Sequence, residues 1–248
     1  MIQNADDNIY LTQPPIMKIC YSEGFLRLDS NEVGFTRANV DAICSIGKSS
    51  KLKSLDRTRS IGKKGIGFKS VFKIADSVWI ASGHYSFKFD KGQLLGMIAP
   101  IWEKFPQTRL EGWTSFLLKL SPSCDTVNLV SQLRSLDSRT LIFLRKLVEV
   151  KVEISDDHVR PVANLTRRDM SGFSGLQQLN LEGDECSPFI VSRHSPPTHV
   201  CTGHDLPIDL GDIWIVFPSI PTGAPDKTHN TFSFLPIRNY GLKVSPKT

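Results

Sequence analysis

The order of apolar and polar positions along the chain predicts short strands mixed with a few helices. The clearest pattern covers residues 148–154, where valine and isoleucine alternate with glutamate and lysine, as expected for a strand with one buried face. Further strands are expected at residues 16–21, 25–28, 78–81, 85–89, 113–120, 189–192, 213–217 and 231–235. This irregular mixture of elements indicates an α+β fold.

Helices are expected where apolar residues recur every three or four positions. One such pattern covers residues 1–11 and ends before a pair of prolines, which cannot continue a helix. A second helix is expected to begin at Thr36, a good N-cap residue, and to end near Gly47. A third is expected over residues 126–147.

A change in composition near residues 155–160 predicts a domain boundary. Before it, helical and strand patterns are mixed, whereas after it prolines separate short strands. We therefore expect a first domain at residues 1–155 and a partial, β-rich second domain at residues 156–248.

Composition favours a protein of a reducing compartment. The 248 residues include five cysteines without regular spacing, which does not suggest a disulfide framework. No apolar run approaches the roughly 18 residues of a membrane span, and the polar start of the chain lacks a signal-peptide pattern. We expect an intracellular protein of the cytoplasm or nucleus, with no membrane partner.

A glycine-rich segment is the first candidate for a binding site. Gly62, Gly65 and Gly67 are spaced G-x-x-G-x-G and lead into an amphipathic helical pattern at residues 68–75. Such a loop exposes backbone N–H groups at the positive end of a helix dipole, which together attract phosphate. A purely structural glycine turn explains the same pattern, so other parts of the chain must decide.

Basic residues surround this glycine segment. Between Lys48 and Lys73 there are nine lysines and arginines and a single acid, Asp56, although the whole chain has a net charge of only +5. The polar, basic stretch 48–61 has the composition of a lid over a binding site. The excess charge suits nucleotide phosphates or nucleic acid, and a solvated basic face is the simpler alternative.

Four segments, taken together and in this order, resemble a known family. They are Gln3-Asn4-Ala5-Asp6-Asp7, Asn31-Glu32-Val33-Gly34-Phe35, the glycine segment with the following Phe68-Lys69, and Gly112-Trp113-Thr114. Their combination is similar to the GHKL ATPase domain of heat-shock chaperones, gyrase, MutL and histidine kinases, and most similar to its sacsin and NO VEIN branch. The resemblance covers about residues 1–155 and implies a two-layer sandwich, with a mostly antiparallel sheet under helices.

The resemblance also implies roles for individual residues in binding ATP and Mg²⁺. Asn4 would ligate Mg²⁺ through its amide oxygen, and Asp7 would line the same wall of the pocket. The glycine segment would cradle the phosphates, Gly34 would allow close approach of the nucleotide, and Thr114 would bond to the adenine edge. The full set of expected nucleotide-binding residues is Asn4, Asp7, Asn31, Gly34, Lys48, Gly62, Gly65, Gly67, Phe68, Lys69 and Thr114. For Asn4 and Asp7 a solvated helix face, and for Thr114 a simple strand position, are the alternatives.

Two features depart from the family pattern. The family's general base is a glutamate four residues before the motif asparagine, a position that lies ahead of Met1, so no catalytic residue is assigned and hydrolysis is expected to be weaker by roughly two to four orders of magnitude. The position of the adenine-reading aspartate is occupied by Ser30. Asp29, Ser30 and Asn31 therefore all stay open as the residue that reads the base.

We therefore expect an ATP- and Mg²⁺-binding GHKL-type domain with weak or no hydrolysis, in a chain that lacks the start of its first helix. Expected partners are the nucleotide, with protein clients or other domains of a larger protein. The alternatives are a nucleic-acid-binding module that uses residues 48–73 and a non-binding remnant of the family.

Overall fold

The computed structural model divides the chain into two compact units. Unit 1 comprises residues 1–136 and 145–164, and unit 2 comprises residues 137–144 and 165–248. The structure describes residues 1–11, 14–45, 67–136, 138–155, 159–170, 177–182, 187–194, 213–218, 228–233 and 235–243.

Unit 1 is built on a sheet with the strand order β7, β1, β2, β6, β3, β4, β5. Strands β1 and β7 run parallel, and the other neighbours run antiparallel, which confirms the predicted α+β class. The strands are β1 Ile16–Ser22, β2 Phe25–Ser30, β3 Ala75–Ser82, β4 Tyr85–Asp90, β5 Ile101–Trp102, β6 Thr114–Leu120 and β7 Glu149–Ser155.

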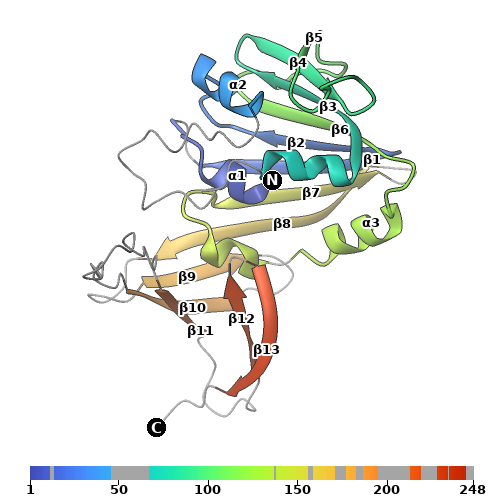
Figure 1. Ribbon diagram of the computed structural model, residues 1–248. Helices are drawn as coiled ribbons and strands as arrows, with labels where there is room; N and C mark the ends of the chain where they lie inside the picture. Colours follow the sequence, from blue (N-terminus) through green and yellow to red (C-terminus); the bar gives the residue numbers. More distant parts are fainter. Residues whose placement is uncertain are drawn as a thin grey trace, which may run out of the picture. The chain divides into compact units, whose positions relative to one another are not determined.

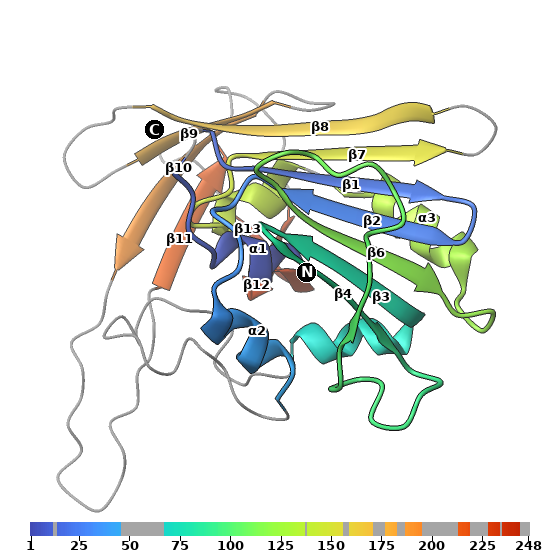
Figure 2. The same ribbon diagram turned by 90° about the horizontal axis from the view of Figure 1, so that it is seen from above.

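The two faces of this sheet differ in character. Because opposite residues of paired strands share a face, the register places Leu28, Phe116 and Ile80 together on one face. On that side lie the helices α1 (Ile2–Asp6), α2 (Arg37–Ile43) and η2 (Phe68–Lys73, a 3-10 helix), as Figures 1 and 2 show. On the opposite face a smaller cluster joins Ala81, Leu117 and Phe105 with the partly buried Phe25 and Trp79.

The first helix is much shorter than its pattern predicts. It ends at Asp6, and Ile9, predicted to share its apolar stripe, is 63% exposed. The cause is the Asp6 carboxylate, which accepts backbone N–H groups from Arg145, Lys146 and Leu147 at 2.8 Å each. These bonds fix the helix end against the start of β7, and the chain then turns away.

The second helix matches its prediction better, because its start is set by a local signal. The Thr36 hydroxyl accepts the Asn39 backbone N–H, and the Asn39 side chain accepts the Thr36 N–H in return. This reciprocal capping box fixes the first turn.

The other two predicted helices are partly wrong. Residues 68–73 form a 3-10 helix followed directly by β3, so the strand displaces the last predicted turn. The pattern at 126–147 gives α3 (Thr126–Arg134) and, after a break, the 3-10 helix η3 (Ser138–Phe143). The break begins at Ser135, whose hydroxyl donates to the Gln132 carbonyl at 3.0 Å, a bond of the kind that competes with helix continuation.

Unit 2 is β-rich in the part that the structure describes. Strand β8 (Val159–Met170) starts in unit 1 and continues into unit 2, where β9, β10 and β11 follow it in antiparallel order, while β12 and β13 form a separate pair. The strands are β9 Gln177–Glu182, β10 Ser187–His194, β11 Ile213–Pro218, β12 Thr228–Ser233 and β13 Leu235–Lys243. The strands expected at 189–192 and 213–217 are confirmed, whereas β8, β9 and most of β13 were not predicted.

One buried cation anchors unit 2. The Arg167 side chain is 5% exposed and donates to the backbone carbonyls of Leu141, at 2.9 Å, and Leu144. These bonds satisfy carbonyls at the end of η3, where a helix leaves acceptors unpaired.

Within the described ranges, no helix is long and apolar enough to cross a bilayer.

Candidate functional site

The end of the glycine segment lies against the first helix. A Cβ placed on Gly67 would be 3.4 Å from Oδ1 and 3.8 Å from Nδ2 of Asn4. Asn4 and Gly67, both predicted site residues, are therefore neighbours in space although they are far apart in the sequence. The absence of a side chain at Gly67 leaves the amide of Asn4 room on that side.

A second approach of backbones occurs at Gly34. This residue has φ +91, a conformation that favours glycine, and a Cβ here would lie 3.4 Å from Ser82 Oγ and 3.5 Å from the Gly83 nitrogen. The backbone N–H of the next residue, Phe35, donates to Ser82 Oγ at 2.7 Å. The β3–β4 turn thus supports the segment that contains Gly34.

Thr114 belongs to the same arrangement. It is fully buried, and its hydroxyl shares a hydrogen bond of 2.6 Å with Ser82 Oγ. Through Ser82 it is linked to the backbone of Phe35. A bond between Thr114 and an adenine stays a prediction, and the contact in the structure is with Ser82.

The three candidates for adenine recognition have different hydrogen-bond partners. Asp29 accepts Arg27 Nε at 2.9 and 3.1 Å and the Ser115 hydroxyl at 2.5 Å. Asn31 accepts the Ile16 N–H at 2.7 Å and donates to the Pro14 carbonyl at 2.8 Å. The side chains of Asp29 and Asn31 therefore hold the local fold together.

Ser30 is buried as well, and its side chain is hydrogen-bonded to Tyr10. It pairs directly with Thr114 across β2 and β6, so the two side chains share a face of the sheet. On this face Phe116, two residues after Thr114, contacts Phe35 and Phe68 with ring centroids 6.2 and 6.1 Å apart. Of the three candidates, Ser30 lies on the sheet face that is covered by the segments after Gly34 and Gly67.

Phe68 and Lys69 are engaged in packing. The Phe68 ring contacts those of Phe72, Phe89 and Phe116. Lys69 Nζ donates to the carbonyls of Ile43, at 2.7 Å, and Met97, and burial lowers its pKa to about 8. Contact of Lys69 with phosphate stays a prediction, since its ammonium bonds to backbone carbonyls here.

Asp6 and Asp7 play different parts although they are adjacent. Asp6 is fully buried by its three backbone bonds, whereas Asp7 caps the helix and is half-buried. Lys146 Nζ donates to the carbonyls of Asp7, at 3.4 Å, and Asn8, at 2.5 Å. The sequence singled out Asp7 for the pocket wall, and Asp6 and Ser82 were not predicted to matter.

A buried polar cluster lies behind α1. Tyr10 donates to the Ala5 carbonyl at 2.8 Å, and its pKa is raised by burial and by the nearby carboxylates of Glu32 and Asp6. Glu32 is only 5% exposed. This cluster links the Asn31–Phe35 segment to the end of the first helix. A backbone bond adds to the link, because the Val33 N–H donates to the Ile9 carbonyl at 2.9 Å.

Several predicted site residues cannot be compared. Lys48, Gly62 and Gly65 lie outside the described residues, as does the expected lid at 48–61. Among the residues that are described, no group of three or more His, Cys, Asp or Glu side chains is arranged to hold a metal ion. A Mg²⁺ ion that keeps most of its waters does not require such a group.

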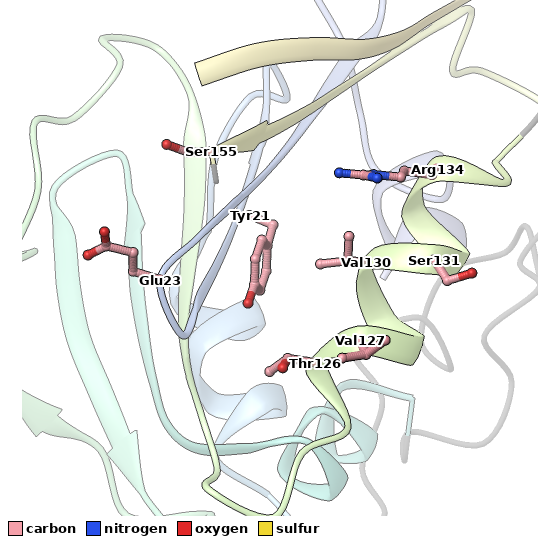
Figure 3. Close-up of a pocket in the computed structure, with 8 residues that line it drawn as sticks. All are labelled: Tyr21, Glu23, Thr126, Val127, Val130, Ser131, Arg134 and Ser155. Carbon is pink, nitrogen blue, oxygen red and sulfur yellow. The ribbon is translucent and has the colours of Figure 1, made fainter. Parts of the chain in front are cut away.

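A separate cavity of about 550 Å³ lies between α3 and the ends of β1 and β7. Figure 3 shows the Tyr21 ring facing Val130 and Thr126 of α3. None of the predicted nucleotide-binding residues lines this cavity. The motif residues carry the stronger chemical argument for a ligand site, because backbones and side chains approach one another there at glycines.

Comparison with known proteins supports one part of the resemblance. Over 104 residues the chain is 44% identical to Protein NO VEIN of Arabidopsis thaliana. That stretch covers 40% of this chain and 4% of the plant protein, so the chain spans a small fraction of that relative. No family model matches the chain. The similarity to NO VEIN is thus confirmed over part of the chain, and membership of the GHKL class stays a prediction.

Proposed function

We propose that unit 1 binds ATP together with Mg²⁺ in the manner of a GHKL-type domain. The observation that carries the proposal is the convergence of Asn4 and Gly67, two motif residues that are distant in sequence and adjacent in space. The similarity to Protein NO VEIN supports it as well.

The residues present fit such a ligand at two places. At Gly67 a Cβ would be in van der Waals contact with the Asn4 amide, and at Gly34 it would be in contact with Ser82 and Gly83 of the β3–β4 turn. At both positions a side chain would occupy space beside the backbone. Glycine leaves that space open, and close approach of a ligand to the backbone requires it. In this proposal the Asn4 amide oxygen faces the Mg²⁺ ion, and Gly67 leaves space for the phosphates.

The proposal assigns base recognition to Ser30. Its hydroxyl can donate and accept, as an adenine edge requires, and it shares a sheet face with Thr114. Thr114 acts as a positioning residue, because its hydroxyl orients Ser82 and Ser82 holds the backbone beside Gly34.

The direct test is calorimetric titration of the purified chain with ATP, with and without Mg²⁺. We expect saturable binding that is stronger with Mg²⁺. We also expect a rise in the melting temperature with nucleotide concentration, equivalent to about 2.7 kcal/mol at one hundred times Kd. No saturable binding at millimolar nucleotide, or oligonucleotide binding that survives excess ATP, contradicts the proposal.

A pair of asparagine variants makes the test specific. Asn4→Ala is expected to abolish the Mg²⁺-dependent part of the affinity, because it removes the proposed oxygen ligand. Asn128→Ala is the matched control, since Asn128 is exposed on α3 and bonds only Gln132 among the contacts of its side chain that the structure resolves. Equal loss of affinity in both variants would contradict the role of Asn4.

A further inference from the structure

Large apolar side chains are exposed together on the segment between β4 and the end of β5. Leu94 is 94% exposed and Trp102 is 59% exposed, and Leu95, Met97 and Ile101 are exposed as well. We call these five residues the apolar edge. They make up five of the nine large hydrophobic side chains that are exposed in the part of the chain that the structure describes, and such clustering marks interaction sites.

The backbone of Leu95 adds a second observation. It has φ +58, a left-handed conformation that costs a leucine roughly 1 kcal/mol or more. A local turn holds this conformation, because the Leu95 carbonyl accepts the N–H groups of Ile98 and Ala99 at 2.8 Å each, while the side chain stays exposed. Strained residues of this kind are typical of functional sites.

The apolar edge includes an open side of the sheet. Strand β5 pairs with β4 through Trp102 opposite Phe87 and Ile101 opposite Lys88. It is the last strand in the order (Figure 1), and none of the described strands pairs with its other side. The free N–H and C=O groups of an edge strand are a template for a further strand.

Basic side chains outnumber acidic ones by one around the apolar edge, where Lys88, Lys91 and Lys104 stand with Asp90 and Glu103. Both carboxylates have partners, since Asp90 accepts the Gly92 N–H at 3.1 Å, and Glu103 accepts Trp79 Nε1 and pairs with Lys88 at 3.2 Å. Lys91 Nζ donates to the Phe72 carbonyl at 3.3 Å. The exposed charged side chains between residues 91 and 104 are Lys91 and Lys104. The surface therefore complements apolar groups flanked by negative charge.

We propose that the apolar edge binds an extended segment of a partner protein that adds a strand to β5. The segment alternates apolar residues, which cover Trp102 and Leu94, with acidic residues, which pair with Lys91 and Lys104. A protein strand fits better than a lipid surface, because hydrocarbon would leave the open backbone groups of β5 without partners. Main-chain bonds then give affinity and alternate side chains give specificity. This inference is independent of nucleotide binding.

The probe is a synthetic, fluorescently labelled peptide of about eight residues in which glutamate alternates with valine, a length typical of strand addition. Fluorescence polarisation with the full chain is expected to show saturable binding. A peptide with lysine in place of glutamate is expected to bind at least about tenfold more weakly because of like charge. An acidic peptide with N-methyl groups on alternate residues is expected to lose binding, because it lacks the N–H donors.

The variant Leu94→Ser combined with Leu95→Asn removes apolar surface without disturbing the fold, since both side chains are exposed and asparagine tolerates positive φ. It is expected to weaken peptide binding by about tenfold. The control Leu11→Ser changes a leucine that is 83% exposed elsewhere and is expected to bind normally.

Three results would overturn the proposal. One is equal binding of the acidic, basic and N-methylated peptides, or no binding of any. Another is self-association of the wild type that the double variant abolishes, which would assign the apolar edge to a second copy of the chain. The third is cosedimentation with phosphatidylserine vesicles that the double variant abolishes, which would assign it to a membrane surface.

Discussion

Two adjacent residues of β6, Thr114 and Ser115, show that the scaffold and the candidate site use neighbouring positions of one strand. Thr114 and Ser115 are both fully buried, but they point to opposite faces of the sheet. Thr114 bonds to Ser82, which supports the backbone at Gly34 and Phe35. Ser115 bonds to Asp29, which is held by Arg27. One residue serves the proposed nucleotide side and the next serves the scaffold.

The same division recurs within the other motifs. Asn4 lies beside Gly67, whereas Asp6, two residues later, accepts three backbone N–H groups. A matching motif therefore does not mean that every residue in it contacts a ligand. Substitutions on the scaffold side are expected to change stability, and those on the nucleotide side to change affinity.

The largest effect is expected on the scaffold side, at Asp29. Asp29→Ala removes the carboxylate that pairs with the largely buried Arg27 charge and accepts from the Ser115 hydroxyl. Among the hydrogen bonds of the described residues, Arg27 then keeps only its bond to Gln107. It is expected to lower the free energy of unfolding by about 3 kcal/mol in urea denaturation. Asp41→Ala, in an exposed pair with Arg37 at 3.8 Å, is expected to cost less than about 0.5 kcal/mol. Similar costs for both would refute the scaffold role of Asp29.

On the nucleotide side, comparing Gly34→Ala with Gly24→Ala separates the effect of backbone strain from the effect of a contact at the proposed site. Gly34→Ala adds backbone strain of about 1 kcal/mol and brings a methyl group against Ser82 and Gly83. ATP affinity is expected to fall by more than about tenfold. Gly24→Ala carries similar strain, at φ +80, but meets nothing within 4 Å, and its affinity is expected to stay normal. A similar loss in both variants would attribute the effect to strain alone.

A smaller and sharper contrast is expected between the two hydroxyls themselves. Thr114→Val and Ser115→Ala each remove one buried hydrogen bond, worth about 1 kcal/mol of unfolding free energy. Thr114→Val is expected to weaken ATP binding by about threefold as well, roughly 0.6 kcal/mol, because Ser82 loses an orienting partner. Titration of both proteins under one set of conditions checks this, and reduced affinity in Ser115→Ala would erase the distinction.

The smallest effect concerns pH and Lys69. Burial lowers its pKa from 10.5 to about 8, so between pH 8 and 10.5 the unfolded chain binds more protons than the folded one. The contribution of Lys69 to stability therefore rises with pH across this window and is constant below it. Urea denaturation from pH 7 to 10 is expected to show a shallower rise in Lys69→Met than in the exposed control Lys119→Met. Identical slopes would contradict the burial of the charged form.

The sequence predicted the strands of unit 1 well because their alternation is local. Residues 148–154 needed no distant partner to be recognised, and the Thr36 capping box marked a helix start. By contrast, the end of α1 at Asp6 depends on N–H groups about 140 residues away, which no local pattern reveals. β8 escaped prediction because its mixed polar residues lack strict alternation.

The candidate site was predictable in part. The motifs singled out Asn4, Gly34, Gly67 and Thr114; the structure places Asn4 beside Gly67 and links Thr114 through Ser82 to the backbone next to Gly34. The choice among Asp29, Ser30 and Asn31 required the register of β2 against β6, since a shift of one position changes the face. The role of Ser82 required the same long-range pairing.

Titration of Mg²⁺–ATP into wild type, Gly67→Ala and Gly92→Ala tests the central proposal most directly. A Cβ on Gly67 would lie 3.4 Å from Asn4 Oδ1, and one on Gly92 would lie 3.4 Å from Asp90 Oδ1, so the two variants are matched in contact and neither has positive φ. The predicted result is that wild type and Gly92→Ala bind alike, while Gly67→Ala binds more than about tenfold more weakly with an unchanged melting temperature in the absence of nucleotide. Equal binding by all three proteins, or binding by none, would contradict a nucleotide site between Asn4 and Gly67.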